Sequence, residues 1–107
     1  MKVMIVDDEK PIRQWFEFIL RGISHMEIEI TGSYANGQAA LEACKEDPPD
    51  VIFCDIIMPV MNGIELIRQV KESFPAVEVL ILSNFDDFDY VRQGLRYGAL
   101  DYLLKAK

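Results

Sequence analysis

The chain is short of cationic side chains, of histidine and of cysteine. It has 11 lysine and arginine residues against 18 acids, one histidine and two cysteines, and its formal net charge is −7. An acidic surface repels phosphate backbones, so we expect no direct nucleic-acid binding by this domain. Cys44 and Cys54 form no C-x-x-C pair and have too few companions for a zinc site. We interpret them as reduced core thiols.

Long hydrophobic runs are absent too. The longest apolar stretches have the length of a strand, so none of them predicts a membrane span. The first residues, MKVMIV, are too short for the apolar region of a signal peptide, which predicts a cytoplasmic protein. No repeat, linker or low-complexity tract divides the chain, and we expect a single domain over residues 1–107.

Strand-like and helix-like segments alternate along the chain. Short apolar or alternating runs predict strands at residues 2–6, 27–34, 51–54, 77–82 and 101–105. Helical periodicity and end signals predict helices at residues 11–22, 36–47, 62–74 and 86–98. The same periodicity places one face of three helices toward the core: Ile12, Trp15, Phe16, Ile19 and Leu20 in the first, Ile67, Val70 and Phe74 in the third, and Phe88, Val91 and Leu95 in the fourth.

This alternation predicts an α/β fold. Right-handed crossovers between the strands give a doubly wound, five-stranded parallel sheet with helices on both faces. No helix follows the fifth strand, so we expect a final helix to be absent or truncated and some apolar sheet surface to be exposed. The domain is then expected to be the N-terminal part of a longer protein.

Polar residues follow several of the predicted strands. The carboxyl ends of parallel strands share one edge of a sheet, where ligands of open α/β proteins bind. The residues expected at that edge are Asp7, Asp8, Glu9, Asp55, Ser83, Asn84 and Lys105. Each alone has a plain structural explanation, as a helix-start acid, a strand-end acid, a turn residue or a solvated charge.

Together these residues predict phosphoryl transfer. Three converging carboxylates repel one another unless a cation lies between them, and ligands that are all oxygen suit Mg²⁺ better than zinc. An aspartate can act as a nucleophile and form an acyl phosphate. Lys105 would supply a point charge for phosphoryl oxygens, and the hydroxyl of Ser83 could donate to another oxygen.

The ordered motifs resemble those of a response-regulator receiver domain from two-component signalling. The resemblance covers essentially the whole chain and rests on VDDE, DIIMPVMNGIEL, LSNF and GALDYLLK, each after or within the expected strand. It implies the flavodoxin-like strand order 2-1-3-4-5. The segment FDDFDYVRQGLRYGALDYLLK is most similar to receivers that precede an AraC-type helix-turn-helix output domain.

The resemblance assigns roles to individual residues. Asp55 would be the phosphoacceptor that takes a phosphoryl group from the histidine of a sensor kinase. Asp8, Asp55 and the Ile57 carbonyl would bind Mg²⁺ directly, and Asp7 mainly through water. Lys105 would pair with the phosphoryl group. The domain would catalyse only its own phosphorylation and dephosphorylation, and is otherwise not an enzyme.

The resemblance also implies a switch. Ser83 would be the switch hydroxyl and Tyr102 the switch aromatic. Phosphorylation would draw Ser83 toward Asp55, let Tyr102 turn inward and reshape the face of the fourth helix and fifth strand. That face would control an output domain beyond residue 107, which we expect to be transcriptional, and homodimerisation on phosphorylation is a further expectation.

This chain departs from the family pattern near the acceptor. Ala106 stands where the family usually has a proline after the lysine, commonly joined by a cis bond. A non-proline cis bond costs roughly 2.5–4 kcal/mol, which favours a trans bond here. Ile57 and Phe85 would flank the path of an attacking water, and neither can position it. We therefore predict slow self-dephosphorylation.

Three other functions share some of these sequence features. A flavodoxin-like electron carrier could share the fold, but DDEKP places acids where a flavin phosphate would need a cradling loop. A phosphatase with an aspartyl nucleophile would need a second acid at the position of Ile57. A receiver-like docking module that is no longer phosphorylated remains the alternative, chiefly because of Ala106.

Overall fold

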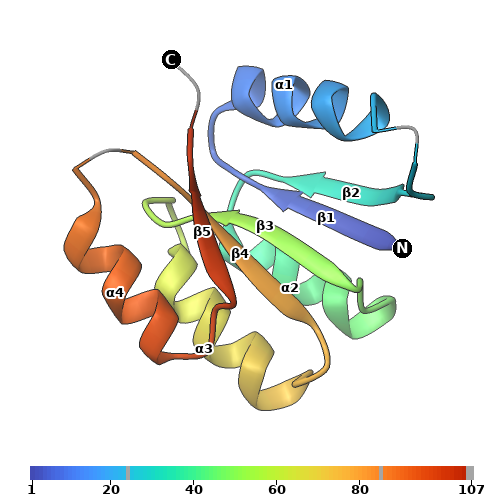
Figure 1. The fold of residues 1–107 in the computed structure, drawn as a ribbon. Helices are drawn as coiled ribbons and strands as arrows, with labels where there is room; N and C mark the ends of the chain where they lie inside the picture. Colours follow the sequence, from blue (N-terminus) through green and yellow to red (C-terminus); the bar gives the residue numbers. More distant parts are fainter. Residues whose placement is uncertain (24, 85, 106–107) are drawn as a thin grey trace.

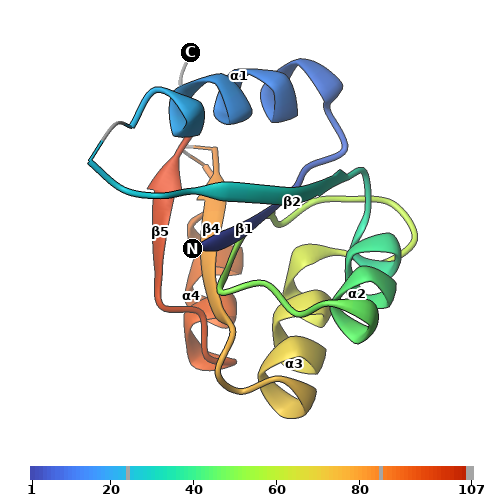
Figure 2. The ribbon, with the colours of Figure 1, turned by 90° about the vertical axis from the view of Figure 1, so that its right-hand side faces the viewer.

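The structure, a computed structural model, describes residues 1–23, 25–84 and 86–105. Within these residues five parallel strands form one sheet in the order β2-β1-β3-β4-β5. Helix α1 lies on one face of this sheet, and α2, α3 and α4 lie on the other (Figures 1 and 2). The predicted doubly wound fold and its strand order are confirmed.

The elements alternate along the chain as the sequence predicts. The strands are β1 (Lys2–Val6), β2 (Glu29–Tyr34), β3 (Val51–Asp55), β4 (Glu78–Ser83) and β5 (Asp101–Leu104). The helices are α1 (Lys10–Arg21), α2 (Gly37–Glu46), α3 (Gly63–Ser73) and α4 (Phe88–Arg96). Asn36 and Asn62 cap α2 and α3, and each side-chain oxygen accepts a backbone N–H three residues on.

The three central strands are buried on both faces. Val3 and Ile5 of β1 pack with Phe16 and Leu20 of α1, whereas the alternate residues of the strand pack against the helices of the other face. The two faces therefore have separate cores, as expected for a parallel sheet with helices on both sides. This double burial fixes the direction in which each strand delivers its last side chain.

Two of the predicted helix faces are wrong in part. Phe16 and Leu20 of the predicted α1 face are buried, but Trp15 and Ile19 of the same face are 37% and 39% exposed. Phe88 is 66% exposed and Leu95 is 37% exposed.

Helix α4 buries Val91, as predicted, together with Gly94. An added Cβ at Gly94 would lie 2.6 Å from Cδ1 of Ile81. The missing side chain thus allows α4 to approach β4 closely. Packing therefore explains why a glycine, which lowers helix propensity, stands inside α4.

The edge strand β5 leaves apolar surface exposed. Leu103 is 44% exposed and Leu104 is 58% exposed. In the described part of the chain, α1 is the helix on the face to which Leu103 belongs, and it packs over β1 and β3. The expectation of exposed apolar sheet surface is confirmed.

Gly63, at the start of α3, packs against the backbone of the loop that follows β3. An added Cβ would lie 2.8 Å from the Ile56 Cα and still closer to the Asp55 carbonyl oxygen. We expect Gly63→Ala to lower the free energy of unfolding by about 2 kcal/mol, because backbone atoms cannot move aside cheaply. Urea denaturation measures the change.

Gly22→Ala is the matched control for this substitution. A Cβ at Gly22 would make an ordinary 3.4 Å contact with the Ile19 carbonyl oxygen, in a right-handed backbone conformation. We expect little change in stability. Equal unfolding midpoints for the two variants would contradict the packing explanation.

Candidate functional site

Three strands deliver charged side chains to the same edge and the same face of the sheet. Asp7 follows β1, Asp55 ends β3 and Lys105 follows β5. Two residues earlier, Ile5 and Phe53 lie opposite each other in register and belong to the α1 face. Because side chains alternate along a strand, the three charged residues continue that face. The expected convergence at this edge is confirmed for them.

Lys105 joins the two buried acids. Its Nζ lies 2.9 Å from Asp7 Oδ2 and 3.1 Å from Asp55 Oδ2, and its side chain is only 5% exposed. Glu9 adds a more distant carboxylate oxygen at 3.7 Å. The backbone N–H of Lys105 donates to the Ser83 carbonyl at 2.8 Å, which ties the lysine to β4.

The acids are close enough together to share one cation. One oxygen each of Asp7, Asp8 and Asp55 lie within 4.8 Å of one another. Asp7 and Asp55 are buried, and Asp8 is exposed. Apart from the Lys105 ion pair, Asp7 Oδ2 has no hydrogen-bond partner among the described residues, although it is buried. A set of carboxylate oxygens with one buried lone pair unmatched fits Mg²⁺.

The loop between β3 and α3 holds the Asp55 carboxylate in place. Asp55 Oδ1 accepts the backbone N–H of Ile56 at 2.7 Å. The Ile56 carbonyl in turn accepts the N–H of Gly63 at 2.7 Å, which closes the loop onto the start of α3. Ile57, whose carbonyl is a predicted metal ligand, follows in this loop with 54% of its surface exposed. No measured contact ties that carbonyl to the acids, so its role stays a prediction.

The far side of the same loop is a tight turn. The Met61 N–H donates to the Pro59 carbonyl at 2.7 Å, and the residue between them, Val60, has φ of 67°. A β-branched residue rarely adopts this conformation, so the turn is strained. The Met61 carbonyl accepts the N–H of Gly37 at 2.9 Å, which anchors the turn to α2.

Burial and charge shift the pKa of the acceptor and of the lysine. Burial, with the negative charge of Asp7, raises the pKa of Asp55 to about 6, although Lys105 opposes the shift. Burial alone would lower the pKa of Lys105, but its hydrogen bond to Asp7 and the charge of Asp55 raise it. Asp55 is therefore ionised above pH 6, and Lys105 stays cationic.

Cys54 and Cys44 are free buried thiols, as predicted. Burial raises the pKa of Cys54, and the neighbouring Asp55 and Asp7 charges raise it further. Burial also raises the pKa of Cys44 to about 11. Neither thiol is a nucleophile at neutral pH, which leaves Asp55 as the nucleophilic candidate among these groups.

Ser83 and Tyr102 lie beside the site but do not contact the acids within the described residues. The Ser83 side chain is fully buried, and its hydroxyl donates to the Leu103 carbonyl at 3.5 Å. Tyr102 lies in register with Ile81 of β4 and is 43% exposed. Phe85 and Ala106, which also entered the prediction, lie outside the described residues.

Arg13 is a residue near the site that sequence reasoning missed. Its guanidinium donates a hydrogen bond to the backbone carbonyl of Asp7. The signal available in the sequence was a cation in the first turn of a helix, where the helix dipole favours acids instead. A cation at this position suggests a side-chain interaction with a group outside the helix.

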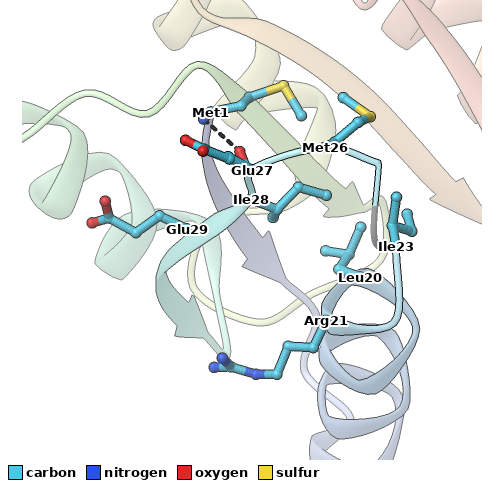
Figure 3. A pocket seen from close by; sticks show the side chains of 8 residues that line it. All are labelled: Met1, Leu20, Arg21, Ile23, Met26, Glu27, Ile28 and Glu29. Atoms are coloured by element: carbon cyan, nitrogen blue, oxygen red, sulfur yellow. Dashed lines mark hydrogen bonds between the residues drawn. The ribbon is translucent and has the colours of Figure 1, made fainter.

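A cavity of about 420 Å³ lies at the other end of the strands (Figure 3). It opens between the end of α1 and the start of β2, and Leu20, Ile23 and Ile28 supply much of its apolar lining. The Met1 ammonium there already donates to the Glu27 carbonyl at 2.8 Å. The converging charges of the strand ends are at the opposite edge, so the candidate site is not this cavity.

No helix in the described part of the chain is long and apolar enough to cross a membrane. The longest, α1, has 12 residues and carries charged side chains along its length.

The comparisons with known proteins identify relatives over nearly the whole chain. The family described as response regulator receiver domain matches residues 3–107. The transcriptional regulatory protein LnrK of Bacillus subtilis is 37% identical over 105 residues, which cover 98% of this chain and 47% of LnrK. The chain thus spans about half the length of this curated relative.

Solved structures show the same fold. A LuxR-family DNA-binding response regulator from Staphylococcus aureus superimposes with a TM-score of 0.88 at 25% identity, covering 99% of this chain and 87% of that one. The signal receiver domain of NarL from Mycobacterium tuberculosis gives a TM-score of 0.83 at 33% identity, covering 99% and 84%.

The raised pKa of Asp55 predicts how stability changes with pH in the metal-free protein. The folded pKa of about 6 is above the ordinary value of 3.8, so the folded state binds the proton more tightly. This contribution to the free energy of unfolding is present below about pH 4 and is lost as pH rises through 6. We expect Asp55→Asn to stabilise the protein in EDTA by about 2 kcal/mol above pH 7, with no gain near pH 4.

Urea denaturation in EDTA at several pH values measures this difference. Asp89→Asn, which removes an exposed acid of α4, is the control and should show no gain above pH 6. A destabilised Asp55→Asn variant at pH 7.5 would contradict the assignment of a strained buried charge.

Proposed function

This chain belongs to the response regulator receiver family, and on that premise we propose that its edge site takes a phosphoryl group onto Asp55 from a phosphohistidine of a sensor kinase. The observation that carries the proposal is the buried contact of Lys105 Nζ with Asp7 and Asp55 at 2.9 and 3.1 Å. It brings an acceptor, a metal-binding acid and a phosphate-binding cation into one site.

The proposed transfer is a displacement at phosphorus. An Asp55 carboxylate oxygen forms a bond to phosphorus while the P–N bond of the phosphohistidine breaks. The electron pair of that bond passes to the imidazole nitrogen, which takes a proton from solvent. With a pKa of about 6, Asp55 is ionised and nucleophilic at neutral pH.

The other residues of the site would orient the phosphoryl group and offset its negative charge. Asp8 and Asp55 would hold Mg²⁺ directly and Asp7 through water, with the Ile57 carbonyl as a further ligand. When bound, Mg²⁺ supplies the charge that offsets repulsion between the acceptor and the incoming phosphoryl group. Lys105 exchanges part of its contact with the acids for a phosphoryl oxygen.

Ser83 and Tyr102 would convert phosphorylation into a change of surface. Among the described residues, the Ser83 hydroxyl has one long bond, to the Leu103 carbonyl, to give up before it donates to the phosphoryl group. Tyr102, which is 43% exposed, would turn inward when the loop after β4 moves toward Asp55. The face changed is that of α4 and β5.

For the whole protein we propose a cytoplasmic regulator with an output domain beyond residue 107. The transcriptional name of LnrK and the DNA-binding name of the Staphylococcus aureus structure support a transcriptional, DNA-binding output domain, and its helix-turn-helix fold stays a prediction. The AraC-type class stays a prediction, because that structure is of the LuxR family. The domain acts on its own aspartate rather than on a separate substrate, and homodimerisation on phosphorylation belongs to the same proposal.

Incubation with acetyl phosphate tests the acceptor directly. We expect one added phosphoryl group per chain, dependent on Mg²⁺, read by intact-protein mass spectrometry. Asp55→Asn should abolish it, because the nucleophilic oxygen is lost, while Asp89→Asn should leave it unchanged. A chain that takes up no phosphoryl group from acetyl phosphate or from a sensor kinase would instead be a docking module.

The lifetime of the phosphorylated state tests the proposed role of Ile57, two residues after the acceptor. Its exposed apolar side chain cannot hold an attacking water, so we expect slow decay of the acyl phosphate. Ile57→Asn should hasten decay several-fold by positioning water, whereas Val60→Asn, three residues further along the loop, should not. Equal decay rates for wild type and Ile57→Asn would contradict the explanation.

A further inference from the structure

The position of Arg13 in the first turn of α1 is not explained by interactions within that helix. It lies in the first turn of α1, where Lys10 is a second cation and no acid is present. Positive charge at a helix N-terminus is unfavourable because of the helix dipole. The Arg13 side chain instead reaches out of the helix and donates to the Asp7 carbonyl.

With that hydrogen bond, each polar group of Asp7 has a contact: the backbone N–H, the backbone carbonyl and both carboxylate oxygens. The Asp7 N–H donates to the Tyr34 carbonyl at 3.0 Å, and Asp7 Oδ1 accepts the Glu9 N–H at 2.8 Å. Asp7 Oδ2 faces Lys105 at 2.9 Å. The carbonyl bound by Arg13 belongs to the peptide group that joins Asp7 to Asp8, so the hydrogen bond restrains the backbone that carries both carboxylates.

The exposed member of the acid set most needs this support. Asp8 is exposed, and α1 begins without a side-chain cap at Glu9. Within the described contacts, the turn between β1 and α1 is therefore held on its helix side chiefly by Arg13 and by the bonds of the first helical turn to the Glu9 carbonyl.

We propose that Arg13 is a positioning residue, which holds the turn after β1 through the Asp7 carbonyl so that Asp7 and Asp8 stay directed toward Asp55 for Mg²⁺. This rests on the proposed function, since it concerns the same metal site. It differs from a simple effect of charge, because a nearby cation repels Mg²⁺ and its removal alone would tighten binding.

The test compares Mg²⁺ binding by calorimetry in four proteins: wild type, Arg13→Gln, Arg13→Lys and Lys10→Gln. We expect Arg13→Gln to weaken Mg²⁺ binding at least 10-fold, as loss of an outer contact to a metal ligand typically does. Arg13→Lys should recover part of the affinity, because it keeps one donor without the planar guanidinium. Lys10→Gln removes an equal charge from the same exposed helix turn and should bind at least as tightly as wild type.

A second readout separates positioning from general damage to the fold. The rate of phosphorylation by acetyl phosphate at saturating Mg²⁺ should approach the wild-type rate in Arg13→Gln, with the loss confined to the Mg²⁺ midpoint. Arg13→Lys carries the same comparison should Arg13→Gln fail to fold, and it should show a smaller shift of that midpoint.

The outcomes distinguish this inference from the proposed function. Wild-type affinity or tighter binding in Arg13→Gln overturns the positioning role, as does an equal weakening in Lys10→Gln. If the wild-type chain itself binds no Mg²⁺, the proposed function fails and the inference fails with it.

Discussion

The structure depends on placing two buried carboxylates side by side with a lysine between them. Asp7 and Asp55 are almost fully buried, and an isolated ion buried in this way would cost several kcal/mol. Lys105 offsets that cost only if β1, β3 and β5 stop at matching levels of one sheet edge. The order of strands, their register and the double burial of β1 and β3 are what make the levels match.

The sequence predicted this convergence because it follows from topology. Once the strands were placed, parallel pairing put Asp7, Asp55 and Lys105 at one edge. That they also share one face follows from the observed register and from side-chain alternation. The buried face of α4 was harder to predict, because the helix carries apolar residues on two sides. Close packing at Gly94 determines which side is buried. From the sequence, Gly94 is expected only to lower the helix propensity of α4. The structure shows that the missing side chain makes room for Ile81.

What the sequence could not predict are contacts to the backbone. Arg13 donates to the Asp7 carbonyl, and Gly63 packs on the Asp55 carbonyl. Because the partners are backbone atoms, the sequence shows no pair of complementary side chains that would predict either contact. Both contact the peptide groups next to the acids rather than the acid side chains. The strained turn at Val60 is another case, because a valine at positive φ contradicts its own preference and depends on the anchors of the loop at Ile56 and Gly37.

The central claim is that this edge holds a divalent cation and a phosphoryl group together, with Lys105 moving between acids and phosphate. A crystal structure with Mg²⁺ and beryllofluoride tests it most directly. The account predicts beryllium on a carboxylate oxygen of Asp55, Mg²⁺ about 2.1 Å from an oxygen of Asp8, and Lys105 bound to fluoride rather than to Asp7. An Asp55 that stays unmodified, with Lys105 still between the two buried acids, would contradict the account.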